Sequence, residues 1–143
     1  MEEKYFNRYC SFCRSLRNLE KSKFADPTAE FVLEGTIRNY ILTFDLAWKV
    51  MKDILVKQLR ITDFAIGSPR EVLQSAFTNG LISDDIWPKM LKTRNLLAHD
   101  YDGIIAKKNF RAIISNYYDA FDGLKDAITK FYDGSLPSID SFD

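Results

Sequence analysis

Hydrophobic residues recur every three or four positions along almost the whole chain, which is the spacing of amphipathic α-helices. The first such stripe predicts a helix over residues 2–23. A second, longer stripe follows Asp26 and Pro27, an N-cap residue and a proline suited to a first helical turn. We therefore expect a long second helix to begin there, with an apolar stripe from Phe31 to Leu55. Nowhere does the sequence alternate with the period of two that predicts a β-strand.

The second half of the chain continues the helical pattern with interruptions. RITDFAIG, residues 60–67, breaks the periodicity, and SPRE, residues 68–71, reads as a capping box with proline at the first helical position. A short helix should follow and stop at Gly80. The next helix is expected from about residue 85 to about residue 101, because Ser83 or Asp85 can cap it.

The last helix is predicted to begin after a turn at Asp102 and Gly103 and to end at Gly134. Four substantial helices and a short one, joined mostly by brief turns, predict an all-α fold, an antiparallel up-down helical bundle. A chain of 143 residues with 46% hydrophobic residues suits one domain with a packed core. We expect that domain to span residues 1–134, followed by a loose C-terminal tail at 135–143.

Charge limits the possible partners without naming one. Twenty Lys and Arg residues balance 20 Asp and Glu residues, so no field of the whole molecule attracts nucleic acid or a membrane surface. Any site for a polyanion must therefore be local. The chain has no run of about 18 apolar residues, and its first residues lack the features of a signal peptide. The sequence thus predicts a cytoplasmic protein without membrane contact.

The two cysteines, Cys10 and Cys13, form a single CSFC inside the first predicted helix. A zinc site of the finger type needs a second pair of ligands, and a thioredoxin-like motif needs a βαβ context. Neither is visible, so we interpret both cysteines as buried or half-buried thiols. No metal and no other cofactor is predicted.

The stretch RNLLAHDY, residues 94–101, holds the only histidine of the chain. If the helix continues to residue 101, helical geometry places a polar set on one arc of about 160°. The members of that set are Arg94, Asn95, Ala98, His99 and Tyr101. The opposite side, expected to face the core, carries Trp87, Met90, Leu97 and Ile104, with Leu96 flanking them.

Phosphate chemistry suits this polar set. Arg94 offers a permanent guanidinium fork for phosphate oxygens, and His99 offers an imidazole that titrates near neutrality as a general acid or base. Because the two side chains lie about 140° apart around the axis, they meet on one small group only in a groove between helices. A second copy of the chain could supply that groove. The structural alternative is a surface arginine and a histidine that stabilises a helix end.

RNLLAHDY also resembles the R-N-x-x-x-H-x-Y signature of HEPN domains. The surrounding sequence is similar to one branch of them, the nucleotidyltransferase substrate-binding protein family. Three blocks resemble that branch in order between Ile37 and Asp102. They are IRNYILTFDLAWKVMKDIL, SPREVLQSAFTNGLI, and a W-x-x-M-L-x-x-R-N-x-x-x-H-x-Y-D pattern.

The resemblance implies a homodimeric helical bundle that pairs with a minimal nucleotidyltransferase as a toxin–antitoxin module. It further implies a metal-independent ribonuclease in which Arg94 binds the scissile phosphate, His99 moves the proton and Asn95 orients them. Tyr101 would receive AMP from the partner, and the adduct would restrain cleavage. The alternative is a non-catalytic subunit that binds the substrate or nucleotide of the transferase. The basic residues near the motif are Lys89, Lys92, Lys107, Lys108 and Arg111.

Overall fold

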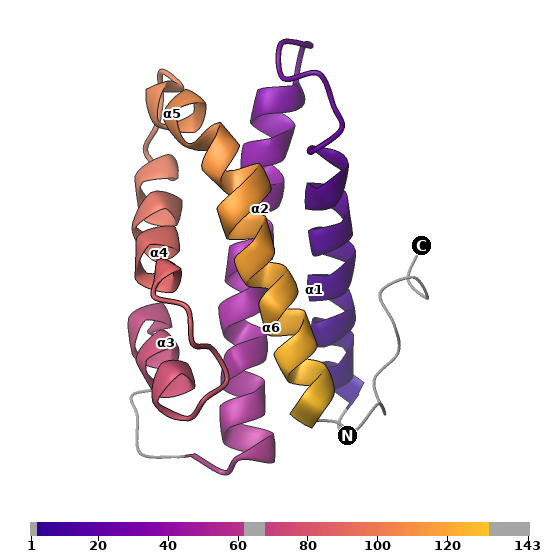
Figure 1. Cartoon of the computed structure of the whole chain (residues 1–143), viewed down its shortest axis with the longest axis vertical. Coiled ribbons are helices and arrows are strands. Elements are labelled where there is room, and N and C mark those ends of the chain that lie inside the picture. The colour runs from indigo at the N-terminus through magenta and orange to yellow at the C-terminus, as the bar shows by residue number, and fades with distance from the viewer. Residues whose placement is uncertain (1–2, 62–67, 132–143) are drawn as a thin grey trace.

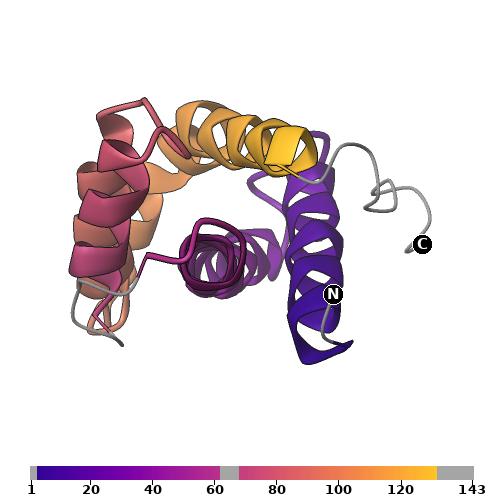
Figure 2. The ribbon, with the colours of Figure 1, turned by 90° about the horizontal axis from the view of Figure 1, so that it is seen from below.

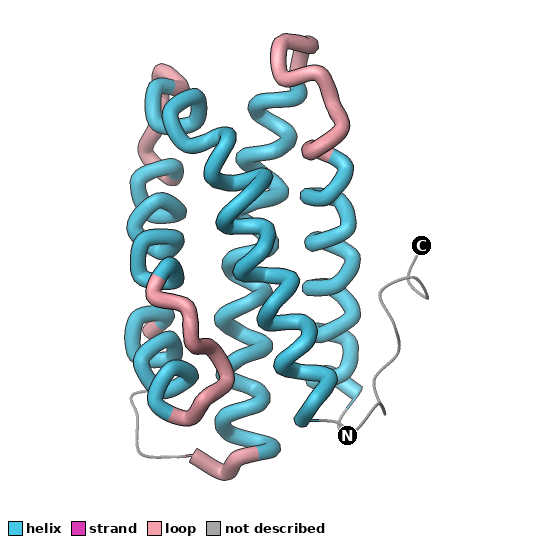
Figure 3. Tube along the Cα trace, in the orientation of Figure 1, coloured by secondary structure: helices cyan, strands magenta, loops and turns pink. Residues whose placement is uncertain are grey.

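The computed structural model describes residues 3–61 and 68–131, and all regular structure in them is helical (Figure 3). The α-helices are α1 (Glu3–Lys21), α2 (Val32–Asp53), α3 (Pro69–Thr78), α4 (Ile86–Leu97), α5 (Ile104–Ala112) and α6 (Tyr118–Phe131). Two π-helical turns continue them: η1 (Ile54–Gln58) extends α2, and η2 (Ile113–Tyr117) joins α5 to α6. The chain bends at η2, as π-turns within helices commonly allow (Figure 1).

The helices form the up-down bundle that the sequence predicts. Helix α1 rises, α2 descends, α4 rises and the α5–α6 run descends, with the short α3 before α4 (Figure 1). Seen along the bundle, α2 occupies the middle, α1 lies on one side of it and α3 and α4 lie on the other (Figure 2). Helix α2 packs against α1, α3, α4 and α5. Side chains on α2 therefore reach most of the molecule.

Aromatic residues fill the centre of the bundle. Tyr40 and Phe44 of α2 are fully buried together with Trp87 of α4 and Phe121 of α6. The Trp87 and Phe121 rings meet edge to face at 5.6 Å, and Tyr40 stacks on Tyr117 at 5.6 Å. Such pairs add a geometric preference to the area that the rings bury. The cluster holds α2, α4 and α6 in one register.

Two buried hydrogen bonds also attach α4 to its neighbours. The Tyr40 hydroxyl donates to the Met90 carbonyl oxygen at 2.7 Å, and the Thr93 and Tyr117 hydroxyls lie 3.0 Å apart. Unpaired buried polar groups are costly, so these partners strongly favour one position of α4 along the bundle. The helix that carries the RN pair is consequently anchored on two sides.

The second helix begins later than predicted. Asp26 caps a local turn instead, because its carboxylate accepts hydrogen bonds from the Thr28 amide at 2.9 Å and from the Thr28 hydroxyl at 2.7 Å. Phe31 then adopts a left-handed conformation with φ 69°, and α2 starts at Val32. The expectation of a helix opening at Asp26 and Pro27 was wrong because the same side chain serves turns and helix caps equally well.

Other boundaries agree more closely. Ser68 occupies the N-cap position of α3 and Pro69 the first helical position, although the Ser68 side chain makes no capping bond. Gly80, with φ 77°, follows the end of α3. Asp85 is the N-cap residue of α4, while the neighbouring Asp84 carboxylate accepts the Ile86 amide. The expectations for Gly134, for the tail and for residues 62–67 lie outside the described residues.

Both cysteines are buried in α1 and unpaired, as the sequence predicts. Burial raises the pKa of both thiols, that of Cys13 to about 11. In the part of the chain that the structure describes, none of the helices has the length and the apolar content needed to cross a bilayer.

Candidate functional site

Helix α4 ends at Leu97, four residues short of its expected end. Residues 98–103 form a connection to α5, named here the α4–α5 turn. The prediction of a helix to residue 101 was therefore wrong, and His99 and Tyr101 are turn residues. Arg94 alone of the three main candidates lies on a helix. The common arc drawn for them on an unbroken helix does not exist.

The reason for this early end is the capping of the next helix by Asp100. Its two carboxylate oxygens accept the backbone amides of Ile105 at 3.0 Å and Ala106 at 2.7 Å. Those amides belong to the first turn of α5 and have no partner within the helix. Gly103, with φ 75°, supplies the left-handed residue that the turn requires. The Asp100 cap therefore favours two shorter helices, α4 and α5, over one continuous helix.

The break also changes which side chains are buried. Ile104, beyond the break, is 62% exposed, although the sequence placed it on the core side. Leu96, before the break, was expected at the flank of that side and is 47% exposed. Trp87, Met90 and Leu97 are buried as predicted. Positions up to the break follow the helical wheel, and Ile104 beyond it does not.

Arg94 is paired within the chain. Its Nε donates to Asp45 Oδ1 at 2.9 Å and its Nη2 donates to Asp45 Oδ2 at 3.0 Å. This is a side-on, two-bond pair between α4 and α2, and both side chains keep less than a third of their area exposed. The Asp45 hydrogen bonds raise the pKa of Arg94 above its ordinary value. Among the described residues, Nη1 has no partner, so one edge of the guanidinium stays free.

Asp45 was missed at the sequence level. It stands between Phe44 and Leu46 in the most apolar part of the second stripe, where a carboxylate needs a partner to be half-buried. That position was the available signal. The partner itself lies 49 residues away and becomes apparent only when α2 and α4 are packed together.

Asn95 faces elsewhere. It lines a groove between α3 and α4 that Arg94 does not line. Within the described residues, no hydrogen bond joins Asn95 to Arg94 or to His99. The single chain therefore does not bring the three residues together, and an orienting role for Asn95 would require a second protein molecule.

His99 and Tyr101 are neighbours on the α4–α5 turn. Their rings meet edge to face with centroids 6.4 Å apart. Tyr101 is 91% exposed, the most exposed of the large hydrophobic side chains described. Both side chains are accessible to a partner molecule. The turn presents a phenol and an imidazole together at the surface.

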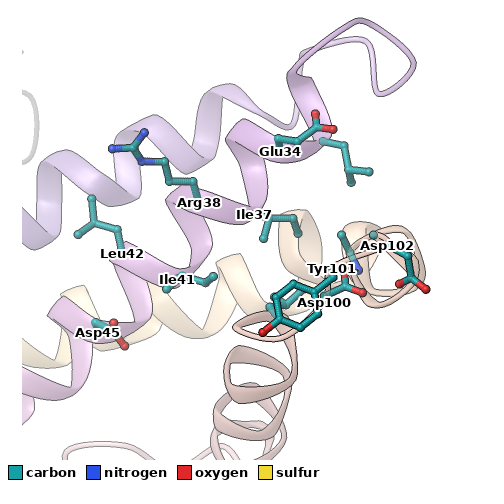
Figure 4. Close-up of a pocket in the computed structure, with 13 residues that line it drawn as sticks. Glu34, Ile37, Arg38, Ile41, Leu42, Asp45, Asp100, Tyr101 and Asp102 are labelled. Atoms are coloured by element: carbon teal, nitrogen blue, oxygen red, sulfur yellow. Dashed lines mark hydrogen bonds between the residues drawn. The ribbon is translucent and has the colours of Figure 1, made fainter.

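Tyr101 borders a groove of about 710 Å³ between α2 and the α4–α5 turn, called here the Tyr101 groove. Ile37, Ile41 and Asp45 of α2 lie along one side of it and Tyr101 along the other (Figure 4). Its lining is largely apolar. A bound molecule in the groove would therefore be held mainly through apolar contacts beside the phenol.

The charged residues of the Tyr101 groove are mostly acidic. The carboxylates are Glu34, Asp45, Asp100 and Asp102, and Arg38 is the one cation among the described lining residues. Arg94 balances Asp45 from outside the groove, which leaves three carboxylates against one guanidinium. Such a rim opposes the entry of a free polyphosphate. Basic side chains lie outside it. They are Lys89, Lys92, Lys107, Lys108 and Arg111, all exposed.

In residues 3–61 and 68–131, no group of three or more histidine, cysteine, aspartate or glutamate side chains is arranged to hold a metal ion. The described groups at the Tyr101 groove and on its neighbouring residues are the Tyr101 phenol, the His99 imidazole, the guanidinium groups of Arg38 and Arg94, and several carboxylates.

Comparison with known families gives a match over residues 5–130 to the family described as nucleotidyltransferase substrate binding protein like. The matched interval spans the bundle from α1 to α6, including both sides of the Tyr101 groove. No curated protein sequence matches the chain.

Proposed function

Because the chain belongs to the nucleotidyltransferase substrate binding protein-like family, we propose that it is the acceptor subunit of a minimal nucleotidyltransferase, with Tyr101 as the acceptor. One observation carries the proposal: Tyr101 is 91% exposed on a turn beside an apolar groove. A tyrosine ring exposed to water contributes little to the packing of the bundle. It is well placed to enter the active site of another protein.

The reaction would be nucleotidyl transfer. The phenolic oxygen of Tyr101 attacks the α-phosphorus of a nucleoside triphosphate, ATP for AMP transfer. The bond from that phosphorus to the pyrophosphate oxygen breaks, and pyrophosphate leaves. The phenolic proton passes to a base, and His99 is the nearest imidazole, with its ring centroid 6.4 Å from that of Tyr101.

The acidic rim of the Tyr101 groove supports delivery of the nucleotide by a partner. Glu34, Asp100 and Asp102 oppose a free triphosphate, so the chain is poorly suited to bind ATP itself. In a transferase that already holds the triphosphate together with a metal ion, the negative charge of the phosphates is largely neutralised. Exposed apolar side chains near the groove, Leu42 and Ile104, offer it contact area.

The test is to incubate the purified chain with its transferase and ATP and to measure the intact mass. The expected result is a mass increase of one nucleotidyl group, mapped to Tyr101 by peptide fragmentation. Tyr101→Phe should abolish the mass increase. Tyr118→Phe, at the half-buried first residue of α6, should leave it unchanged. A modified Tyr101→Phe protein would refute the assignment.

A second candidate function is metal-independent RNA cleavage by a homodimer. The observation that favours it is the free Nη1 edge of Arg94, together with the exposed lysines around the motif. Arg94 would bind the scissile phosphate through Nη1. The 2′-hydroxyl of the RNA would attack the phosphorus, the 5′-oxygen would leave, and His99 would move the proton.

We expect this activity to use a second copy of the chain, because no contact joins Arg94 to His99 among the described residues: Arg94 pairs with Asp45 and His99 contacts Tyr101. Cleavage should persist with a metal chelator and disappear in Arg94→Ala and in His99→Ala. Nucleotidyl transfer to Tyr101 would place an anion beside His99 and repel the RNA backbone, so the modified protein should cleave more slowly. If the dimeric wild type cleaves no RNA, the RNase function is excluded and the acceptor role is the remaining proposal.

A further inference from the structure

A second groove lies between α3 and α4, and it shares no lining residue with the Tyr101 groove. Its volume is about 1160 Å³, and we call it the α3–α4 groove. It plays no part in the proposed transfer to Tyr101. Asn95 of the motif lines it, so the RN pair separates the two grooves: Arg94 turns to α2 and Asn95 turns to this side.

The lining residues of the α3–α4 groove recur at helical spacing along both helices. On α3 they come in pairs four residues apart, from Pro69 and Arg70 to Phe77 and Thr78. On α4 they run in the same way from Trp87 and Pro88 to Asn95 and Leu96. At 1.5 Å per residue each stripe is about 13 Å long. The groove therefore fits a rod of about two and a half helical turns.

The walls of this groove are apolar and partly exposed. Trp87 is 2% exposed and belongs to the core, but Phe77 is 51% exposed and Leu96 is 47% exposed. Two large apolar side chains on facing helices, each half in water, form the kind of surface that partners cover. A helix with apolar residues three and four positions apart would contact both at once.

Within residues 3–61 and 68–131, the charged residues that line the groove are Arg70 and Lys92, and both are exposed cations. None of the described residues that line the groove is a carboxylate, in a chain whose acidic and basic residues are equal in number. The Tyr101 groove has the opposite balance. An occupant of the α3–α4 groove gains from carboxylates beside its apolar stripe, and basic residues there would be repelled.

We infer that the α3–α4 groove is a docking site for an acidic amphipathic helix of a partner protein. Its apolar stripe packs on Phe77 and Leu96, and its carboxylates face Arg70 and Lys92. A nucleotide would use the two cations but would leave most of the apolar wall uncovered. The inference does not depend on the role of Tyr101.

The test uses the full-length protein and two fluorescent helical peptides of about 14 residues. Both carry leucine at positions i, i+3, i+4 and i+7, and they differ only in having glutamate or lysine at the flanking positions. Binding is followed by fluorescence anisotropy. We expect the glutamate peptide to bind about tenfold more tightly than the lysine peptide, the range of effect that complementary charges produce at interfaces.

Three variants locate the binding. Phe77→Ser should weaken binding of the glutamate peptide about tenfold. The double variant Arg70→Glu and Lys92→Glu should reverse the preference towards the lysine peptide. Phe24→Ser, at a side chain that is 83% exposed on the α1–α2 connection, is the matched control and should change nothing. All these positions are at the surface, and circular dichroism confirms folding.

Four outcomes of the binding experiments would overturn the inference. They are the absence of binding by the glutamate peptide, equal binding of both peptides, equal weakening by Phe24→Ser, and displacement of the peptide by ATP at a concentration comparable to its own Kd. A wild-type dimer that dissociates on Phe77→Ser would also overturn it, because a second copy of the chain would then occupy the groove. None of these outcomes bears on modification of Tyr101.

Discussion

The two halves of RNLLAHDY differ in how the fold treats them. Arg94, on helix α4, is held by Asp45 of α2, and the same helix is anchored by the Tyr40 and Tyr117 hydroxyls. His99 and Tyr101, on the α4–α5 turn, are exposed. The first half is fixed in the bundle, and the second half is presented to other molecules. A motif that is contiguous in sequence can thus combine an anchored part with an accessible part.

The largest expected effect on stability is the contrast between two aromatic residues, the buried Trp87 of α4 and the exposed Tyr101 of the α4–α5 turn. Trp87→Ala removes the central ring of the core and should lower the free energy of unfolding by about 4 kcal/mol. Tyr101→Ala removes an exposed ring and should change it by less than about 0.5 kcal/mol. Urea denaturation of both variants measures the contrast. A substantial loss of stability in Tyr101→Ala would mean that the turn is packed against the bundle.

The next effect concerns the ion pair. Asp45→Ala leaves the half-buried Arg94 guanidinium unpaired and should cost about 2 kcal/mol, between the values for exposed and buried pairs. His99→Ala should have almost no effect on stability. A double-mutant cycle with Arg94→Ala isolates the coupling between Asp45 and Arg94. Coupling near zero would show that the pair does not fix α4 against α2.

Tyr40→Phe should cost about 1 kcal/mol, because it removes the hydrogen bond to the Met90 carbonyl oxygen. Burial raises the pKa of Tyr40 well above its ordinary range, so the folded state holds the phenolic proton more tightly than the unfolded state does. That contribution to stability is complete below pH of about 10 and is lost as the pH rises further. Tyr40→Phe has no phenol to titrate at this position. Above a pH of about 10, its free energy of unfolding should therefore fall less steeply with pH than that of the wild type.

An effect of the same size concerns Asp100, which lies between the two halves of the motif. Asp100→Ala removes the acceptor of two α5 amides and should cost about 1 kcal/mol, typical of a lost helix cap. The turn would then hold Tyr101 less firmly, and nucleotidyl transfer should slow while Tyr101 itself remains present. Asp102→Ala, whose carboxylate makes only a long contact of 3.5 Å to Ile104, is the control. Equal effects of the two variants would remove Asp100 from this role.

Periodicity predicted the bundle because the apolar stripes report which side of each helix is buried, and that held for α1, α2 and α4. The end of α4 could not be read in the same way. The residues RNLLAHDYDG keep a helical spacing, and the break depends on Asp100 bonding amides five and six residues later. Local sequence permits both outcomes. The cap on the following helix decides between them.

The sequence likewise identified the candidate residues, but it predicted their positions relative to one another only in part. Arg94, His99 and Tyr101 were recognised from the motif, and the last two are indeed adjacent. The partner of Arg94 lies on another helix, and the separation of Arg94 from Asn95 depends on which neighbours α4 has on each side. These features follow from packing, which helical spacing alone does not determine.

The buried cysteines of α1 can report how often the bundle opens locally. Cys13 is fully covered and its thiol is protonated at neutral pH, so an alkylating reagent can react with it only when α1 moves away from α2 and α6. The labelling rate therefore counts those openings in the native protein. Comparing that rate with and without a bound partner would show whether events at the far side of the bundle, around α4, reach α1.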